Sequence, residues 1–175
     1  MAVATTQEAP ERVKAADECP ECLAGNLGWL LTQAHFNLVS EVGAALEPLG
    51  VSNRGYHVLA TARTGEFTQK ELAERIGLDK TTMVVTVDEL EEKGLAERRP
   101  SSTDRRARVI AVTKAGERAV TQGQRIIDRI QEDVLENLPA KERKVFLEAL
   151  GSLVKDRLGQ PAPDAPPLRR REPRH

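Results

Sequence analysis

Two short amphipathic segments joined by a glycine limit what the middle of this chain can fold into. Thr68 and Glu71 form a T-x-x-E pattern, which predicts a capped helix that ends at Gly77. Asp79 can cap a second helix, which is expected to end at Gly94 because glycine readily adopts the left-handed conformation found after helices. Two short helices joined so tightly predict a helix-turn-helix.

A two-stranded hairpin is predicted directly after these helices. Residues 95–99 and 108–113 are strand-like, and the second segment alternates partly between apolar and polar side chains, as a strand with one wet face should. The loop between them would form a wing. Together with a short helix capped by Ser52, these elements predict a winged helix-turn-helix domain over residues 51–113.

Long helical patterns flank this domain on both sides. Apolar side chains recur at spacings of three and four residues in residues 25–50 and 114–158, and Pro139 divides the second segment into two helices. With only 3% aromatic residues, the composition is typical of helical proteins, so the predicted fold class is mainly α. The flanking helices carry more apolar surface than one small domain needs. We therefore expect them to form a helical dimerisation region.

Polar segments are expected at both ends of the chain. Residues 1–24 are predicted to be a flexible arm and lack the apolar core of a signal peptide, while residues 159–175 hold too much proline and arginine to pack. No run of about 18 apolar residues occurs in the sequence. We therefore expect a cytoplasmic protein that has no membrane partner.

Positive charge is concentrated in one part of a chain whose net charge is only -1. Between residues 93 and 118, eight Lys and Arg residues accompany three Asp and Glu residues. Arg105 and Arg106 lie near the predicted wing tip, where guanidinium groups can contact phosphates or enter a narrow minor groove. Asp104 beside them is expected to orient an arginine through a charge-assisted hydrogen bond. The pattern favours a nucleic-acid partner.

The second helix of the helix-turn-helix is predicted to read bases. If Met83, Val87 and Leu90 face inward, the opposite face and the leading end of the helix hold a lysine, hydroxyl groups and two adjacent valines. Hydroxyls and lysine can bond to phosphates or base edges, and a valine methyl can contact a thymine methyl. The residues predicted to contact DNA on this helix are Lys80, Thr81, Thr82, Val84 and Val85. Alternatively, the two valines pack against the first helix or the wing.

The segment from TQKELAERIG to RVIAVTKAG resembles the winged helix-turn-helix of the MarR family of bacterial transcription regulators. The residues that match the family's wing signature are Asp104, Arg105, Arg106, Ala107 and Thr113. The residues that match its L-E-x-x-G-L-x-x-R motif are Leu90, Glu91, Gly94, Leu95 and Arg98. The similarity covers roughly residues 25–158. One residue departs from the family: Val85 stands where many relatives have an arginine or another polar residue, so no operator sequence can be transferred.

This resemblance implies a homodimer whose recognition helices enter successive major grooves of a pseudo-palindromic duplex. It also implies repression that is relieved by a small, often phenolic or anionic ligand bound between the dimerisation and DNA-binding layers. Candidate ligand-binding residues on the first two helices are His35, Tyr56 and His57. An imidazole can donate to a carboxylate or phenolate and titrates near neutral pH, which suits an anionic aromatic effector. The alternative is that these histidines are hydrogen-bonded structural residues.

Other functions have less support in the sequence. Cys19 and Cys22 form a C-x-x-C pair that could make a redox-responsive regulator, but no further ligand pair completes a zinc site, so no metal is predicted. A winged helix can also be a protein-interaction module. The sequence has no glycine-rich phosphate loop, G-x-S-x-G or H-E-x-x-H motif, so we expect neither an enzyme nor a cofactor.

Overall fold

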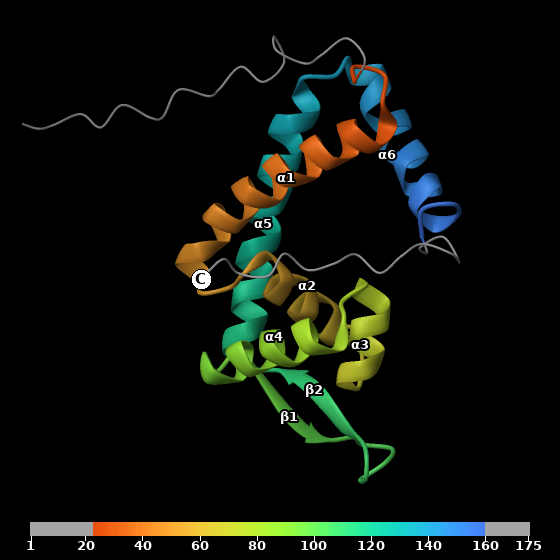
Figure 1. The fold of residues 1–175 in the computed structure, drawn as a ribbon. Coiled ribbons are helices and arrows are strands. Elements are labelled where there is room, and N and C mark those ends of the chain that lie inside the picture. Colours follow the sequence, from red (N-terminus) through yellow and green to blue (C-terminus); the bar gives the residue numbers. More distant parts are fainter. Residues whose placement is uncertain (1–22, 160–175) are drawn as a thin grey trace, which may run out of the picture. The chain divides into compact units, whose positions relative to one another are not determined.

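The computed structural model describes residues 23–159, coloured along the sequence in Figure 1. The chain forms two compact units, one ending at Ile126 and the other beginning at Ile127. Within the described residues, no helix combines the length and apolar character needed to cross a membrane. Cys19, Cys22 and most of the predicted arm and tail lie outside the described residues.

The first unit begins with two helices joined by a short turn. Helix α1 spans Leu27–Leu46 and is followed by a 3-10 turn, Glu47–Leu49, and by α2 at Asn53–Ala62. The side chain of Asn26 caps α1, and that of Ser52 caps α2. The predicted cap of the second helix is thereby confirmed.

The predicted helix-turn-helix consists of α3 at Gln69–Ile76 and α4 at Lys80–Glu92. Thr68 and Glu71 form the predicted reciprocal capping box at the start of α3. Asp79 caps α4, because its carboxylate accepts a hydrogen bond from the third amide of that helix. The glycines that end α3 and follow α4 are both left-handed, with φ of 69° and 65°.

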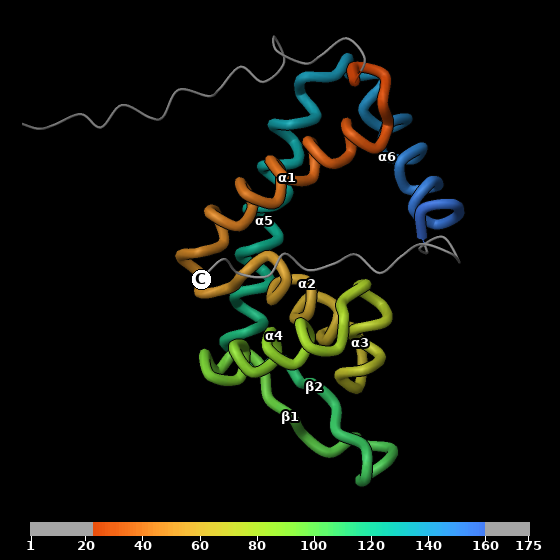
Figure 2. The backbone as a smooth tube through the Cα atoms, in the orientation of Figure 1, coloured from red at the N-terminus to blue at the C-terminus, as the bar shows by residue number. Residues whose placement is uncertain are grey.

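An antiparallel hairpin follows α4 and lies beside it (Figure 2). Strand β1 spans Ala96–Pro100 and pairs with β2 at Arg108–Val112, with the first residue of β1 opposite the last residue of β2. The loop that enters α3 runs along the other side of β2, where the Phe67 carbonyl accepts a 2.9 Å bond from the Ile110 amide. The predicted wing is confirmed and is joined to the helix-turn-helix by backbone contacts.

Side chains from nearly every element meet in the core of the first unit. Helix α5 spans Lys114–Glu136, and its first half belongs to this unit. The largest fully buried side chains of the described residues are Leu46, Val58, Leu59, Leu72, Met83, Val87, Ile110 and Val120. This core fixes α4 and the hairpin on one scaffold, and the predicted fold class, a mainly helical winged helix-turn-helix, is confirmed.

The second unit contains the end of α5 and helix α6, Ala140–Lys155. The Arg143 guanidinium donates to the carbonyls of Leu138 and Glu136, at 3.1 and 3.3 Å, and so closes the turn between the two helices. No residue of α6 is buried. The division into a dimerisation region and a DNA-binding domain at residues 50 and 114 stays a prediction.

Candidate nucleic-acid interface

Helix α4 presents the two faces that its sequence predicts. Met83, Val87 and Leu90 are buried in the core, whereas Val85 is 52% exposed and Val84 is half-buried. Lys80 and Thr81 are exposed near the start of the helix. Packing within the described residues therefore accounts for part of the Val84 side chain but leaves an apolar methyl surface at Val85 facing outward.

Thr82 does not lie on the exposed surface that the sequence analysis expects. Only 7% of it is exposed, and its hydroxyl donates to the Asp79 carboxylate at 2.5 Å while its amide donates to the same group at 2.9 Å. The third residue of a helix lies over the N-cap, so a threonine there completes the cap instead of facing outward. The expected exposure of Thr82 is therefore wrong.

Arg98 connects α4, α3 and β1, a role that the sequence analysis missed. Its guanidinium forms an ion pair with Glu91 and donates to Asp88 at 2.6 Å and to Gln69 at 3.1 Å. Its backbone amide also donates to the Glu91 carboxylate, at 2.7 Å. The L-E-x-x-G-L-x-x-R motif contained the information needed to predict this contact. The chain reverses at Gly94, which brings Glu91 and Arg98 of the motif together. The planar guanidinium of Arg98 thereby fixes α4 against the wing.

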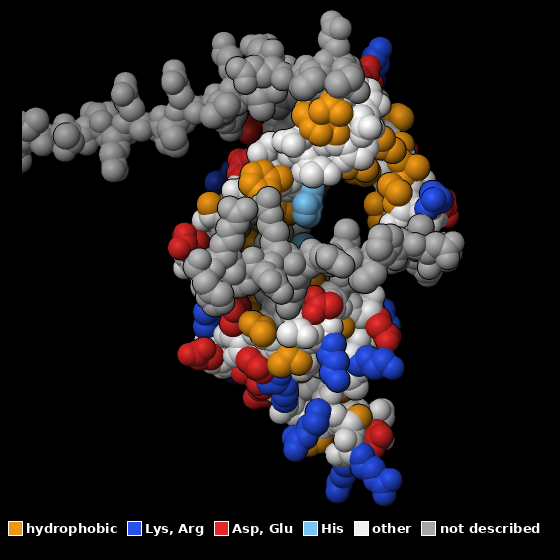
Figure 3. Space-filling model, viewed as in Figure 1, with side chains coloured by type: hydrophobic (Ala, Val, Ile, Leu, Met, Phe, Trp, Pro, Cys, Tyr) orange, Lys and Arg blue, Asp and Glu red, His pale blue; other side chains and the backbone are white. Residues whose placement is uncertain are grey.

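The wing tip carries two arginines on a turn that Asp104 organises. The Asp104 carboxylate accepts a 2.9 Å bond from the Arg106 backbone amide, and its carbonyl accepts a 3.0 Å bond from the Ala107 amide. Asp104 thus fixes the backbone of Arg106. The expected hydrogen bond from Asp104 to an arginine side chain is wrong, because the carboxylate accepts from a backbone amide instead. Arg105 and Arg106 are exposed, and neither forms an ion pair with residues 23–159. Figure 3 shows basic side chains gathered at the far end of the hairpin.

The three predicted ligand-binding residues have different surroundings. Tyr56 is buried, and its hydroxyl donates to the Gln124 side chain at 2.5 Å. His57 packs edge-on against the Tyr56 ring, with 5.9 Å between ring centroids, and partial burial lowers the pKa of its imidazole. His35 is exposed on α1, outside this ring contact. Only Tyr56 and His57 are brought together.

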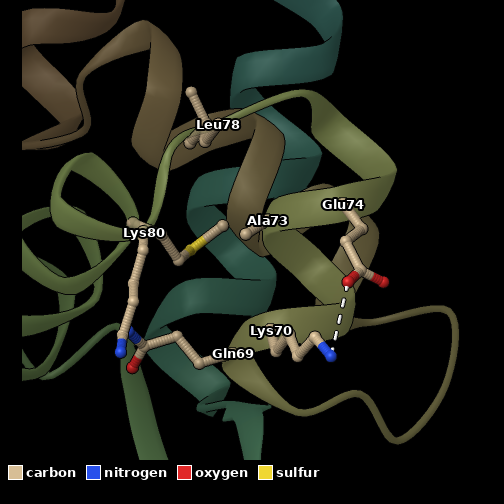
Figure 4. A pocket seen from close by; sticks show the side chains of 7 residues that line it. Gln69, Lys70, Ala73, Glu74, Leu78 and Lys80 are labelled. Carbon is tan, nitrogen blue, oxygen red and sulfur yellow. Dashed lines mark ion pairs between the residues drawn. The ribbon is translucent and has the colours of Figure 1, made fainter.

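A pocket of about 620 Å³ opens between α3 and the start of α4 (Figure 4). The residues that line it are Gln69, Lys70, Ala73, Glu74, Leu78, Lys80 and Met83. None of the three predicted ligand-binding residues is among them. Across residues 23–159, no three His, Cys, Asp or Glu side chains form a group that could hold a metal ion.

Known proteins share both sequence and fold with this chain. A model of the MarR family matches residues 56–107. The chain is 30% identical to CouR from Rhodococcus jostii, solved with p-coumaroyl-CoA, with a TM-score of 0.69 over 78% of this chain and 97% of that one. A MarR-family transcriptional regulator from Rhodococcus sp. is 29% identical, with a TM-score of 0.69 over 78% and 99%. A mutant MarR from E. coli, in complex with operator DNA, has this fold at 23% identity, with a TM-score of 0.65 over 73% and 93%.

Proposed function

Because this chain belongs to the MarR family of transcriptional regulators, we propose that it is a dimeric repressor that binds operator DNA and is released by a small ligand. The observation that carries the proposal is the exposed combination of α4 and the wing. Helix α4 offers Lys80, Thr81 and Val85 to a groove, and the wing offers two arginines that form no ion pair with the described residues.

The chemistry of these groups suits a duplex. Guanidinium and ammonium groups bind phosphates at any sequence, whereas hydroxyl and valine side chains can distinguish base edges in the major groove. At the wing tip, Arg105 and Arg106 can reach into a minor groove, where a narrow A·T-rich segment has enhanced negative potential. A protein-interaction module would not need Arg105 and Arg106 in a loop suited to phosphate, and neither arginine forms an ion pair with residues 23–159.

Exposed apolar side chains support the homodimer. On α1, the large apolar side chains that are at least two-fifths exposed are Leu27, Leu30, Phe36 and Leu38. On α6, the corresponding side chains are Val145, Phe146, Leu147, Leu153 and Val154. Burial of these side chains against a second copy of the chain would remove them from water. A symmetric pair would present two recognition helices to a pseudo-palindromic operator.

The proposed effector is an anionic aromatic molecule. CouR, the 30% identical relative, was solved with p-coumaroyl-CoA, which is aromatic and anionic. The His57 and His35 imidazoles are the proposed donors to such a ligand. The Tyr56 hydroxyl is already bonded to Gln124, so Tyr56 is proposed to form a wall of the site through its ring. Any effector must prefer the dimer conformation that does not fit DNA, because equal affinity for both states shifts nothing.

The test uses the full-length protein and the duplex of its own promoter. Fluorescence anisotropy should give an affinity that falls linearly with the logarithm of salt concentration, as release of counterions requires. p-Coumaroyl-CoA and salicylate are then added as probes, with free coenzyme A as the control for the nucleotide portion. His57→Ala and His35→Ala should reduce release and leave ligand-free affinity within a few-fold. Absence of duplex binding would refute the proposal that the protein is a DNA-binding regulator. Equal ligand-induced release of wild type and the two histidine variants would show that the histidines are not in the ligand site.

A further inference from the structure

An acidic side chain outside the wing holds the beginning of the wing loop. Glu66 lies between α2 and α3, and one oxygen of its carboxylate accepts three hydrogen bonds from the wing. The Ser101 hydroxyl and the Ser102 amide each donate at 2.9 Å, and the Ser102 hydroxyl donates at 3.0 Å. This single carboxylate therefore fixes two consecutive residues at the point where β1 ends.

The charge of Glu66 is stabilised in this position. The Ser102 amide makes the largest contribution to lowering the pKa of the carboxyl, and the Ser101 and Ser102 hydroxyls lower it further. Arg99 lies 3.5 Å from the other oxygen and adds a smaller attraction. The Glu66 side chain consequently remains an acceptor with full negative charge at neutral pH.

The rest of the wing loop is built on the residues that Glu66 holds. The Ser101 amide donates to the Ala107 carbonyl at 3.0 Å and closes the base of the loop. The Ser101 hydroxyl, in a residue that is only 8% exposed, also accepts a 3.2 Å bond from the Thr103 amide. Displacement of Ser101 would therefore disturb both ends of the turn that carries Arg105 and Arg106.

We propose that Glu66 is a positioning residue for DNA binding, which orders the wing so that its arginines meet the duplex in a fixed place. This inference rests on the proposed function. Electrostatic repulsion and wing ordering predict opposite effects of removing Glu66 on the affinity for DNA. A carboxylate beside a DNA-binding wing repels phosphate, so charge alone predicts that its removal tightens binding. If Glu66 orders the wing, its removal weakens binding, because the loop must then lose its conformational entropy on association.

The experiment compares Glu66→Ala, Glu66→Gln and wild type, with Glu97→Gln as the matched control. Glu97 is an exposed acid on β1 whose side chain makes no hydrogen bond or ion pair with the described residues, so its replacement changes charge alone. Glu66→Ala should bind promoter duplex about threefold to tenfold more weakly. Glu66→Gln, which keeps one acceptor oxygen, should lose less. Glu97→Gln should bind as tightly as wild type or more tightly.

A second measurement needs no DNA. Amide hydrogen exchange at Ser102 should accelerate in both Glu66 variants while the amides of α4 keep their protection, which separates a local effect from unfolding. Tighter duplex binding by the Glu66 variants, or unchanged exchange at Ser102, would overturn the inference. A wild-type protein that binds no duplex would instead refute the proposed function and with it the DNA role of Glu66, whereas the exchange result would still decide whether the carboxylate orders the loop.

Discussion

Gly123 allows α5 to pass close to the Tyr56 ring. A Cβ atom at this position would lie 2.9 Å from the ring, closer than real side chains approach one another. The neighbouring Gln124 accepts the hydrogen bond from the Tyr56 hydroxyl, so ring and hydroxyl are both fixed by one turn of α5. At the scale of single residues, this contact determines how α5 packs on α2 in the first unit.

Gly123→Ala should destabilise the protein by about 1 kcal/mol, because overpacking costs about 1–3 kcal/mol and the better helix propensity of alanine returns at most about 1 kcal/mol. Chemical denaturation gives the free energy of unfolding. Gly43→Ala in α1 is the control, since its added Cβ meets nothing within 4 Å and should leave stability unchanged or raise it. Equal effects of the two substitutions would contradict the close packing at Gly123.

Arg106→Ala should weaken binding to promoter DNA about tenfold, at least as much as any single change outside the recognition helix. The reason is that Asp104 fixes the Arg106 backbone, so its guanidinium starts from a defined position. Arg105→Ala should cost less. Anisotropy titrations at several salt concentrations also give the salt slope, which should become shallower by about 0.9 for each phosphate that the variant no longer neutralises. A folded, dimeric Arg106→Ala protein with wild-type affinity would show that the wing does not contact DNA.

At the scale of elements, the orientation of α4 depends on the contacts of the Arg98 guanidinium with acceptor groups on two helices. Asp88 and Glu91 come from α4 itself, and Gln69 comes from α3. The strand that carries Arg98 is thereby attached to both helices of the helix-turn-helix. A change in these contacts should alter how α4 is presented, although the Arg98 guanidinium is already paired with Asp88 and Glu91.

Arg98→Lys should weaken duplex binding about threefold to tenfold, because an ammonium group cannot hold three acceptors in the geometry of a planar guanidinium. Arg118→Lys, the same exchange at an exposed position of α5, should bind like wild type. Anisotropy measures both, and circular dichroism checks that the helices remain. If Arg98→Lys bound the duplex as tightly as Arg118→Lys, the positive charge of Arg98, and not its guanidinium geometry, would account for its role.

Local patterns predicted the elements well and their side-chain contacts poorly. The capping box at Thr68, the left-handed Gly94 and the wing hairpin all depend on residues close in sequence, and all are confirmed. The contact of Glu66 with Ser102 spans 36 residues, and that of Tyr56 with Gln124 spans 68. Such pairs depend on tertiary packing, which no spacing rule encodes. For this reason Tyr56 was proposed as a ligand-binding residue from its residue type and its place on the second helix, without its bond to Gln124, and Glu66 was not predicted at all.

At the scale of the whole molecule, α6 exposes several large apolar side chains among the described residues. Phe146 is 48% exposed and Val145 is 62% exposed, on a helix without a buried residue. A helix of this composition depends on further burial to be stable in water. The proposed second copy of the chain would provide that burial.

Phe146→Glu should shift the protein from dimer to monomer, because burial of the exposed half of this side chain contributes about half of the roughly 1.5–3 kcal/mol of a full burial in each protomer, and a carboxylate in its place would lose its water. Lys144→Glu introduces the same carboxylate elsewhere on α6, at a side chain that is 84% exposed, and should remain dimeric. Sedimentation velocity measures the mass. A Phe146→Glu protein that stays dimeric would place the interface elsewhere.

The contacts around the hairpin also bear on how the protein behaves at high concentration. A sheet of two strands has two free edges, and unpaired amides on such edges can add strands from other molecules. Here the outward amide of Arg98 is occupied by the Glu91 carboxylate, and that of Ile110, directly opposite, by the Phe67 carbonyl. The wing can therefore extend from the protein toward DNA without offering these amides as a template for aggregation.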